Sequence, residues 1–127
     1  MVEVVVGALV RDGQVLLVHR RPDKHAFPGT WDLPGGVVEA GESELDALER
    51  ELREELGVEA DTSTTSLMCR VDLGTAHLAA WLVPDWAGEP ANAAPEEHDD
   101  LGWFGLDELP PLVHELVRQS VVTAMST

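Results

Sequence analysis

Apolar residues at the start of the chain follow the pattern of two neighbouring strands. Residues 2–10 are rich in β-branched side chains, a turn-forming Arg-Asp-Gly segment follows at 11–13, and residues 15–19 resume the apolar run. β-branched residues favour strands, and a short turn of this type joins antiparallel neighbours. We therefore expect an antiparallel hairpin here.

Two later stretches carry apolar residues at helical spacing. Four leucines at positions 45, 48, 52 and 56 trace one face of a helix. Ser43 is a good N-cap for that helix, and Gly57 supplies a left-handed stop after it. Residues 112 to about 125 repeat apolar positions at similar spacing and predict a closing helix.

The remaining segments predict short strands separated by loops. We expect strands at residues 31–33, 67–73, 77–83 and 101–104, a glycine turn at 34–36, and loops at 22–30, 85–92 and 93–100. Strands with one helix in the middle and one at the end predict an α/β fold with a sheet between two helical layers. At 127 residues, the chain 1–127 is expected to form one domain.

Charge narrows the classes of function. With 24 acidic and 8 basic residues the net charge is −16, which argues against a nucleic-acid binder because such proteins need a basic surface. Four of the basic residues, Arg11, Arg20, Arg21 and Lys24, precede the most acidic stretch. They form either a phosphate-facing cluster or a solvated edge.

The cysteine count and the apolar start of the chain bear on where the protein is found. Cys69 is the single cysteine, so no intrachain disulfide is expected. The apolar start is too short for a membrane span and lacks the pattern of a signal peptide. We therefore expect a cytoplasmic protein that binds neither nucleic acid nor membrane.

Three carboxylates converge on the first predicted helix. Because a helix turns about 100° per residue, Glu51 and Glu55 lie about 40° apart and Glu54 about 60° to the other side of Glu51. Clustered carboxylates suit a hard divalent cation such as Mg²⁺. Gly35 and Gly36 before the helix allow close approach of the backbone. The alternative is a surface helix stabilised by charge pairs.

An arginine within the same helix has several acidic partners within reach. Arg50 lies four residues before Glu54 and can pair with it. It can instead reach back to Glu42 or Glu39 and tie the preceding loop to the helix. The leucine face holds the helix against the sheet, so the carboxylates lie on a rigid element, as a metal site requires.

The spacing of these residues resembles a known family signature. From Gly36, five residues lead to Glu42, and seven more lead to Arg50-Glu51-Leu52, followed by Glu54-Glu55 and Gly57-Val58. This pattern resembles the Nudix box, G-x5-E-x7-R-E-U-x-E-E-x-G-U with U apolar, over residues 36–58. The flanking segments PGTWDLPGG and EEHDDLGWFGLDELP look like those of MutT-type Nudix pyrophosphohydrolases.

The resemblance implies a fold, a reaction and a metal. It implies an α/β/α sandwich with a mixed β-sheet between helices, and hydrolysis of a nucleoside diphosphate linked to another moiety with Mg²⁺, or alternatively Mn²⁺. Metal ligands would be Glu51, Glu54, Glu55 and the carbonyl of Gly35.

The resemblance also implies catalytic roles for further residues. Arg50 would orient the glutamates, with Glu42 as its partner. One glutamate would accept a proton from the attacking water. Glu54 is one candidate, and in some members a glutamate from a later loop takes this part or adds a ligand. Here Glu96 and Glu97 occupy that region, and we favour Glu97.

Substrate contacts are expected from the segment between the hairpin and the glycine turn. Arg20 is the candidate for phosphate, with Arg21 beside it, although strand-end surface charge is the alternative. Phe27 lies in a loop that could cover a base, and Trp31 could stack on one. Most tryptophans are otherwise expected in the core or at its rim.

The substrate is predicted from missing signatures. The chain lacks the proline typical of ADP-ribose hydrolases, the array of NADH-type members and the tyrosine of dinucleoside-polyphosphate hydrolases. This favours a nucleoside triphosphate, normal or oxidised, split to the monophosphate and pyrophosphate. Alternatives are a hydrolase of NDP-sugars or other nucleotide derivatives, a non-hydrolysing nucleotide sensor, and an acidic metal-buffering or interaction domain. A homodimer is also considered, as Nudix proteins are often dimers.

Overall fold

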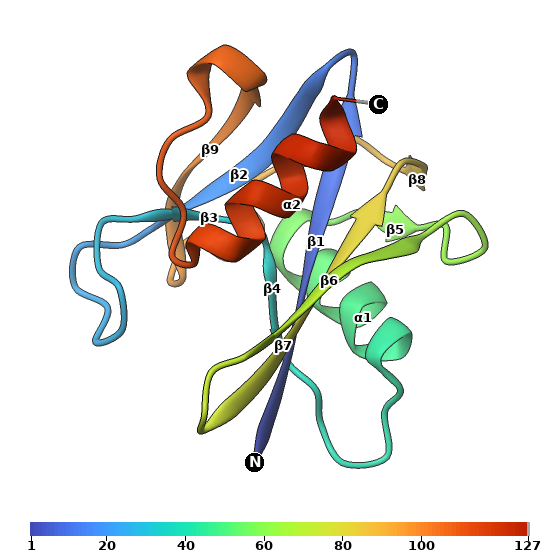
Figure 1. The fold of residues 1–127 in the computed structure, drawn as a ribbon, viewed down its shortest axis with the longest axis vertical. Coiled ribbons are helices and arrows are strands. Elements are labelled where there is room, and N and C mark those ends of the chain that lie inside the picture. The colour runs from blue at the N-terminus through green and yellow to red at the C-terminus, as the bar shows by residue number, and fades with distance from the viewer. Residues whose placement is uncertain (127) are drawn as a thin grey trace.

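The computed structural model describes residues 1–126, which form a mixed sheet between two helices (Figure 1). The helices are α1 (Glu44–Leu56) and α2 (Glu115–Met125). The main sheet contains β1 (Val2–Arg11), β2 (Gln14–Arg20), β3 (Trp31–Asp32), β4 (Gly35–Val37), β6 (Ser66–Asp72), β7 (Ala76–Val83) and β9 (His98–Gly105). A separate pair consists of β5 (Glu59–Ala60) and β8 (Trp86–Ala87), and a 3₁₀ turn, η1 (Leu106–Glu108), follows β9.

The sheet has the order β3-β2-β1-β7-β6, with β4 added beside β1 and β9 beside β2. β1 runs parallel to β7 over its whole apolar length, from the pair Val2↔Ala76 to the pair Leu9↔Val83. The other strand pairs are antiparallel. The prediction of an α/β/α sandwich with a mixed sheet is therefore confirmed.

Strand alternation divides the core into two layers. Successive residues of a strand point to opposite faces, so Val5 and Leu9 of β1 pack with α1, whereas Val6 and Ala8 pack with α2. In Figure 1, α2 crosses in front of the strands and α1 lies beyond them. The central strands are apolar on both faces because both faces are covered by a helix.

The helix that carries the acidic cluster has the predicted ends. The Ser43 hydroxyl accepts a hydrogen bond from the Asp46 N–H at 3.1 Å, which caps the start of α1. Gly57, with φ of 72°, ends the helix and donates its N–H to the Arg53 carbonyl. Leu48, Leu52 and the other buried residues of α1 anchor it to the sheet, so the opposite flank of the helix is fixed in place.

The first two strands diverge and thereby open a gap in the sheet. β1 pairs with β2 only next to their turn, at Val10↔Val15 and Arg11↔Gln14. Farther from the turn, β1 pairs with β4 and β2 pairs with β3 instead. The short link between β3 and β4 crosses from one half of the sheet to the other, and the gap beside it becomes the site described below.

Several element boundaries differ from the sequence prediction. Residues 34–36 were expected as a turn, but Gly35–Val37 forms β4 because Val5 and its neighbours on β1 offer free backbone partners. The last strand begins at His98 rather than at residue 101, since residues 98–100 pair with β2 despite their polar side chains. The β5–β8 pair was not predicted from its two-residue segments.

The closing helix begins at Glu115, three residues later than expected. Leu112 is buried and forms a bridge to Trp31, so it is held in an extended backbone rather than a helical one. The Arg118 side chain donates to the carbonyls of Leu109 and Pro110, which stabilises the non-helical approach.

Among the described residues, none of the helices combines the length and apolar character that a membrane crossing needs. The structure describes a single chain, so the homodimer stays a prediction.

Candidate active site

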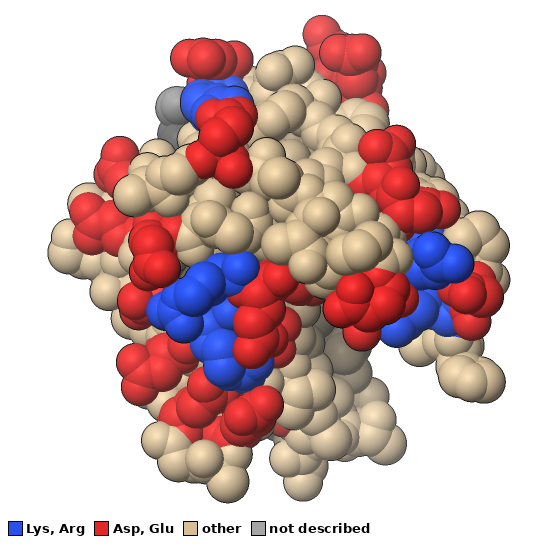
Figure 2. Space-filling model, turned by 180° about the vertical axis from the view of Figure 1, so that it is seen from behind, with Lys and Arg blue, Asp and Glu red and all other residues tan. Residues whose placement is uncertain are grey.

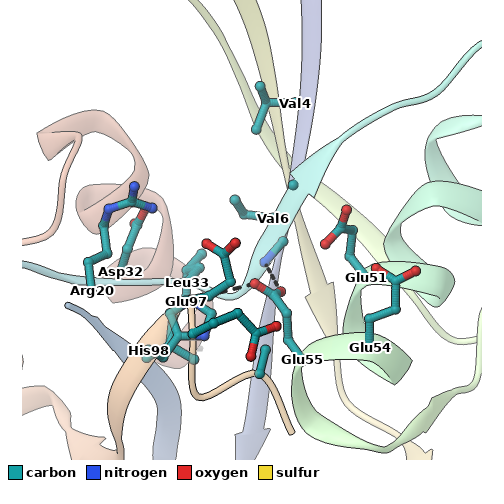
Figure 3. A pocket seen from close by; sticks show the side chains of 15 residues that line it. Val4, Val6, Arg20, Asp32, Leu33, Glu51, Glu54, Glu55, Glu97 and His98 are labelled. Carbon is teal, nitrogen blue, oxygen red and sulfur yellow. Dashed lines mark hydrogen bonds and ion pairs between the residues drawn. The ribbon is translucent and has the colours of Figure 1, made fainter. Parts of the chain in front are cut away.

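A cavity of about 560 Å³ lies where β1 and β2 separate, and it has two unlike walls. Figure 3 shows Glu51 and Glu54 of α1 on one side, and Arg20 and Asp32 of β2 and β3 on the other. Glu55, also of α1, is the most buried of the three glutamates. We call Glu51, Glu54 and Glu55 the acidic wall, and Arg20, Asp32 and Leu33 the opposite wall.

Two glycines bring the backbone close to the acidic wall. At Gly35 φ is 156°, and a β-carbon there would lie 2.0 Å from the Val5 carbonyl oxygen of β1. At Gly36 a β-carbon would lie 2.5 Å from the carboxyl carbon of Glu51. A side chain at either position would therefore collide with the sheet or with the acidic wall, which explains why this segment consists of glycine.

Arg50 binds the acidic residues on both sides of the α1 start. Its Nε and Nη2 donate to the two carboxylate oxygens of Glu42 at 2.7 and 3.0 Å. Its Nη1 donates to Glu51 at 2.9 Å and to Glu54 at 3.3 Å. Glu39 is also within ion-pair distance, at 3.8 Å. All the partners considered from the sequence are thus in contact with this one guanidinium.

These contacts change the acidity of the groups involved. The Arg50 hydrogen bonds, followed by the Glu39 N–H, lower the pKa of Glu42 to about 2. The hydrogen bond to Glu42 in turn raises the pKa of Arg50 above its usual range. Arg50 and Glu42 therefore stay charged at neutral pH, and together they hold the side of the acidic wall next to the loop.

Glu55 is the buried member of the acidic wall, with 7% of its surface exposed. The Gly35 N–H donates to its Oε2 at 2.8 Å, and Nε2 of His98 lies 3.5 Å from its Oε1. Burial, followed by the charge of Glu51, raises the pKa of Glu55 to about 9. Burial also lowers the pKa of His98, so the imidazole is neutral at pH 7 and offers little compensation.

The donors of the acidic wall fit a hard divalent cation. Three carboxylates and the Gly35 carbonyl are oxygen ligands of the type that Mg²⁺ prefers. Burial raises the pKa of Glu51 despite its contact with Arg50, and burial raises the pKa of Glu55, which has no Arg or Lys partner in the described part of the chain; a bound cation would favour the ionised form of both. Among residues 1–126, no three acidic, His or Cys side chains already converge as a ligand group, so the glutamates would have to rotate inward.

The opposite wall carries an available cation. Arg20 donates its Nε to the Ala26 carbonyl at 2.9 Å. Of all the described Arg and Lys side chains, only Arg20 has no carboxylate within ion-pair distance. The other basic side chains are paired with carboxylates, and Figure 2 shows basic groups bordered by acidic groups on the face that it draws. Burial raises the pKa of Asp32, next to Arg20, to about 6.

The rim of the cavity comes from the loop before β9. Glu96 and Glu97 both line the cavity, so the structure does not separate the two candidates for a later-loop glutamate. The Lys24 amine donates to Glu97 at 2.7 Å, and this hydrogen bond lowers the pKa of Glu97. Glu97 is therefore ionised at neutral pH, in contrast to Glu55.

Three residues expected to bind substrate lie outside the cavity lining. Arg21 pairs with Asp23 and donates to the Pro95 carbonyl. Phe27 is exposed, with its ring edge against His114. These contacts hold both side chains outside the cavity lining.

Trp31 is the third of these residues. Its ring packs edge-on between His19 and Phe104, with centroid distances of 4.8 and 4.9 Å. Asp32, the next residue of β3, lines the cavity instead because consecutive strand residues point to opposite faces. This alternation was the signal that could have identified Asp32. His98 was not identified as a site residue because its segment reads as a solvated loop.

Comparisons with known proteins agree with this geometry. The profile of the NUDIX domain matches residues 1–124. The CTP pyrophosphohydrolase of Escherichia coli (strain K12) is 42% identical over 110 residues, which cover 85% of this chain and 78% of that protein. A Mycobacterium tuberculosis (strain H37Rv) protein provisionally named 8-oxo-dGTP diphosphatase 2 is 43% identical over 110 residues, 84% of this chain and 74% of the relative.

A solved structure shows the same fold over nearly the whole chain. The MutT NUDIX hydrolase from Burkholderia pseudomallei matches with a TM-score of 0.82 and 36% sequence identity, covering 94% of each chain. Nudix hydrolases generally use divalent metal ions, in agreement with the donors of the acidic wall. From the domain match, the relatives and the shared fold, the chain belongs to the Nudix family of pyrophosphohydrolases.

Proposed function

We propose that the protein hydrolyses a nucleoside triphosphate, normal or oxidised, to the monophosphate and pyrophosphate with Mg²⁺, or alternatively Mn²⁺. The observation that carries the proposal is one cavity that has the acidic wall on one side and Arg20, without a carboxylate partner among the described residues, on the other. The names of the relatives, which refer to CTP and 8-oxo-dGTP, support a triphosphate. Because such nucleotides are cytoplasmic metabolites, the proposal includes a cytoplasmic location.

The acidic wall would hold the metal. Glu51, Glu54, Glu55 and the Gly35 carbonyl are the proposed ligands. When bound, the metal would neutralise phosphate charge and lower the pKa of an attacking water. Arg50 keeps the wall in position by binding Glu51 and Glu54 from the side, while its own charge is balanced by Glu42.

The opposite wall would hold the nucleotide. Arg20 has charged donors free for a phosphate oxygen, because the hydrogen bond made by its side chain uses only Nε. Leu33 and Val18 are apolar residues of the cavity lining on the same side as Arg20. The carboxyl group of Asp32 lies among them and offers a hydrogen-bonding partner to the edge of the base.

Two carboxylates are proposed as acceptors of the water proton. The Glu54 side chain is 58% exposed and makes one hydrogen bond of 3.3 Å, so it can rotate toward a substrate. Glu97 is ionised because of Lys24 and lines the cavity from the other side. Separate Glu54→Gln and Glu97→Gln variants would distinguish them, since loss of the acceptor also removes the acid limb of the pH–rate profile.

The test is a hydrolysis screen of the purified protein with Mg²⁺ against normal and oxidised nucleoside triphosphates, NDP-sugars and dinucleotides, with products identified by mass. We expect a monophosphate and pyrophosphate. Release of orthophosphate, or turnover of sugar nucleotides alone, would contradict the proposed reaction. Nucleotide binding without hydrolysis would indicate a sensor.

A matched pair of variants tests the acidic wall in the same assay. Glu54→Gln should lower kcat at saturating Mg²⁺ by about a hundredfold or more, because it removes a ligand charge. Glu49 lies on the same helix but outside the cavity lining, and its ion-pair partner is Arg53 at 3.9 Å. The control variant Glu49→Gln should therefore change kcat less than twofold. Near-normal turnover of Glu54→Gln would remove Glu54 from the metal site.

A further inference from the structure

Lys24 is the only lysine of the chain, and it lies outside the cavity lining but beside Glu97, which belongs to that lining. Its amine donates to Glu97 at 2.7 Å and so connects the loop after β2 with the loop before β9. The Lys24 side chain is 27% exposed and that of Glu97 is 46% exposed. A pair this accessible to water contributes little to stability, and either partner can be exchanged.

The cavity contains few cations for a substrate with several negative charges. Its lining includes six carboxylates, on Asp32, Glu51, Glu54, Glu55, Glu96 and Glu97, and one basic side chain, Arg20. Arg50 is already bound to Glu42, Glu51 and Glu54. Lys24 is the next cation available, since its partner Glu97 itself lines the cavity.

The Lys24–Glu97 contact is not needed to hold the loop in place. The same loop is attached through backbone hydrogen bonds from Arg20 to Thr30 at 2.8 Å and from Gly29 to Arg20 at 3.1 Å. The Arg21 N–H donates to the Glu97 carbonyl, and the Arg21 side chain donates to Pro95. The Lys24 amine can therefore leave Glu97 while the two loops stay together.

We propose that Lys24 is a second phosphate-binding residue that exchanges partners: it holds Glu97 in the free protein and a substrate phosphate in the complex. A phosphate oxygen offers the amine a charge-assisted hydrogen bond equal in kind to the one it leaves. The exchange releases the Glu97 carboxylate, which already lines the cavity, from Lys24 only after a nucleotide has bound. The inference rests on the proposed function and extends it.

A double-variant comparison separates phosphate binding from the contact with Glu97. In Glu97→Gln the partner charge is absent, so any remaining effect of Lys24 on affinity must come from the ligand. We expect Kd for Mg²⁺-tripolyphosphate, measured by calorimetry, to rise about tenfold from Glu97→Gln to Lys24→Met/Glu97→Gln. Lys24→Arg/Glu97→Gln should recover most of the affinity.

The control variant removes an ion pair of the same length elsewhere. Arg70 donates to Glu44 at 2.7 Å, outside the cavity lining, so Arg70→Met/Glu97→Gln should bind tripolyphosphate within twofold of Glu97→Gln. Equal Kd values with and without Lys24 would overturn the inference, as would an absence of tripolyphosphate binding to the parent protein. Hydrolysis of nucleoside triphosphates by the parent protein is scored separately, so that the proposed function can stand or fail independently.

Chemical labelling gives a second measurement that needs only the single variant. Because Lys24 is the only lysine, acetylation of its amine can be followed by mass spectrometry of one peptide. Without ligand, Lys24 should be acetylated several-fold faster in the Glu97→Gln variant than in the parent protein. Saturating tripolyphosphate should protect the Lys24 amine of the variant again. Unchanged labelling of Glu97→Gln in the presence of tripolyphosphate would overturn the proposed exchange.

Discussion

The two walls of the cavity are built in different ways. The acidic wall comes from two turns of α1, and its brace, Arg50, belongs to the same helix. The opposite wall is assembled from the end of β2, from β3 and from the loop before β9, which are brought together by strand pairing. The proposed metal ligands thus lie on one rigid local element, whereas the proposed contacts to the nucleotide depend on segments that are distant in the sequence.

The walls also differ in how their charges are balanced. On the acidic wall, carboxylates share one guanidinium, and Glu55 is buried without a cation of its own. On the opposite wall, Arg20 has no carboxylate partner within the described chain, and Lys24, outside the lining, has an exposed one. The acidic wall therefore suits a bound cation and the opposite wall offers one, which is the charge arrangement that the proposed metal-bound polyphosphate would need.

The largest expected effect comes from the glycine beside the acidic wall. Gly35→Ala places a β-carbon 2.0 Å from the Val5 carbonyl oxygen, in the backbone of β1 that cannot move without opening the sheet. We expect a loss of about 4 kcal/mol or more in the free energy of unfolding, measured by urea denaturation. The turnover rate of Gly35→Ala should also fall, because the Gly35 N–H donates a hydrogen bond to Glu55.

A second glycine isolates the contribution of this collision. Gly41 has φ of 85° but nothing within 4 Å of a β-carbon, so Gly41→Ala should cost only about 1 kcal/mol from backbone strain. Equal losses in the two variants would mean that the close approach of Gly35 to β1 does not matter.

The next effect concerns the buried charge of the acidic wall. Glu55 has a folded-state pKa raised to about 9, above its usual value of 4.5, so the folded protein holds a proton that the unfolded chain releases. Its contribution is fully present below pH 4.5 and is lost as the pH rises toward 9. Without metal, unfolding free energy should therefore fall by on the order of 4 kcal/mol from pH 5 to pH 8 through this group alone.

Glu55→Gln and Mg²⁺ test this assignment from two directions. The glutamine cannot ionise, so the variant should lose less stability than the parent protein over the same pH range. Mg²⁺ at a hundred times its Kd should add about 2.7 kcal/mol to the parent and raise its Tm, because it binds the folded cluster. Parallel pH profiles of the two proteins, or a Tm unaffected by Mg²⁺, would argue against a cation site at Glu55.

The same contrast explains how much of the site could be predicted from the sequence. The helix of the acidic wall follows from leucine spacing, the Ser43 cap and the Gly57 stop, all of which act within about four residues. The convergence of Glu51, Glu54 and Glu55 on one cavity follows from helical geometry alone. The sheet between two helical layers was predicted from the order of strands and helices, and the resemblance implied the same α/β/α sandwich.

The opposite wall could not be predicted to the same extent, because strand register is not a local property. Asp32 faces the cavity and Trp31 faces away only because β3 pairs with β2 in one register, and a shift of one residue would exchange them. His98 is buried because its polar segment continues β9 beside Arg20. Strand alternation places Trp31 and Asp32 on opposite faces, but the residues alone do not tell which of the two faces the cavity.

A smaller effect is expected on the opposite wall. Arg20→Gln should raise KM for the triphosphate about tenfold with little change in Tm, because it removes one charge-assisted hydrogen bond to phosphate and no ion pair. The neighbouring Arg21→Gln should change KM less than twofold, since Arg21 is committed to Asp23 outside the cavity lining. A larger effect for Arg21 would mean that the loop after β2 turns inward when substrate binds.

The smallest effect is expected at the exposed part of that loop. Phe27 is 51% exposed and contacts His114, so Phe27→Ala should change kcat/KM less than twofold and Tm only slightly. If Phe27→Ala instead raised KM strongly for every base, the Phe27 ring would have to leave His114 and cover the nucleotide. Selectivity would then depend on movement of the loop rather than on the strand register that places Asp32 in the cavity.

Asp32→Asn keeps the size of the side chain but alters its hydrogen bonding. This variant should change the preference among bases more than Phe27→Ala does.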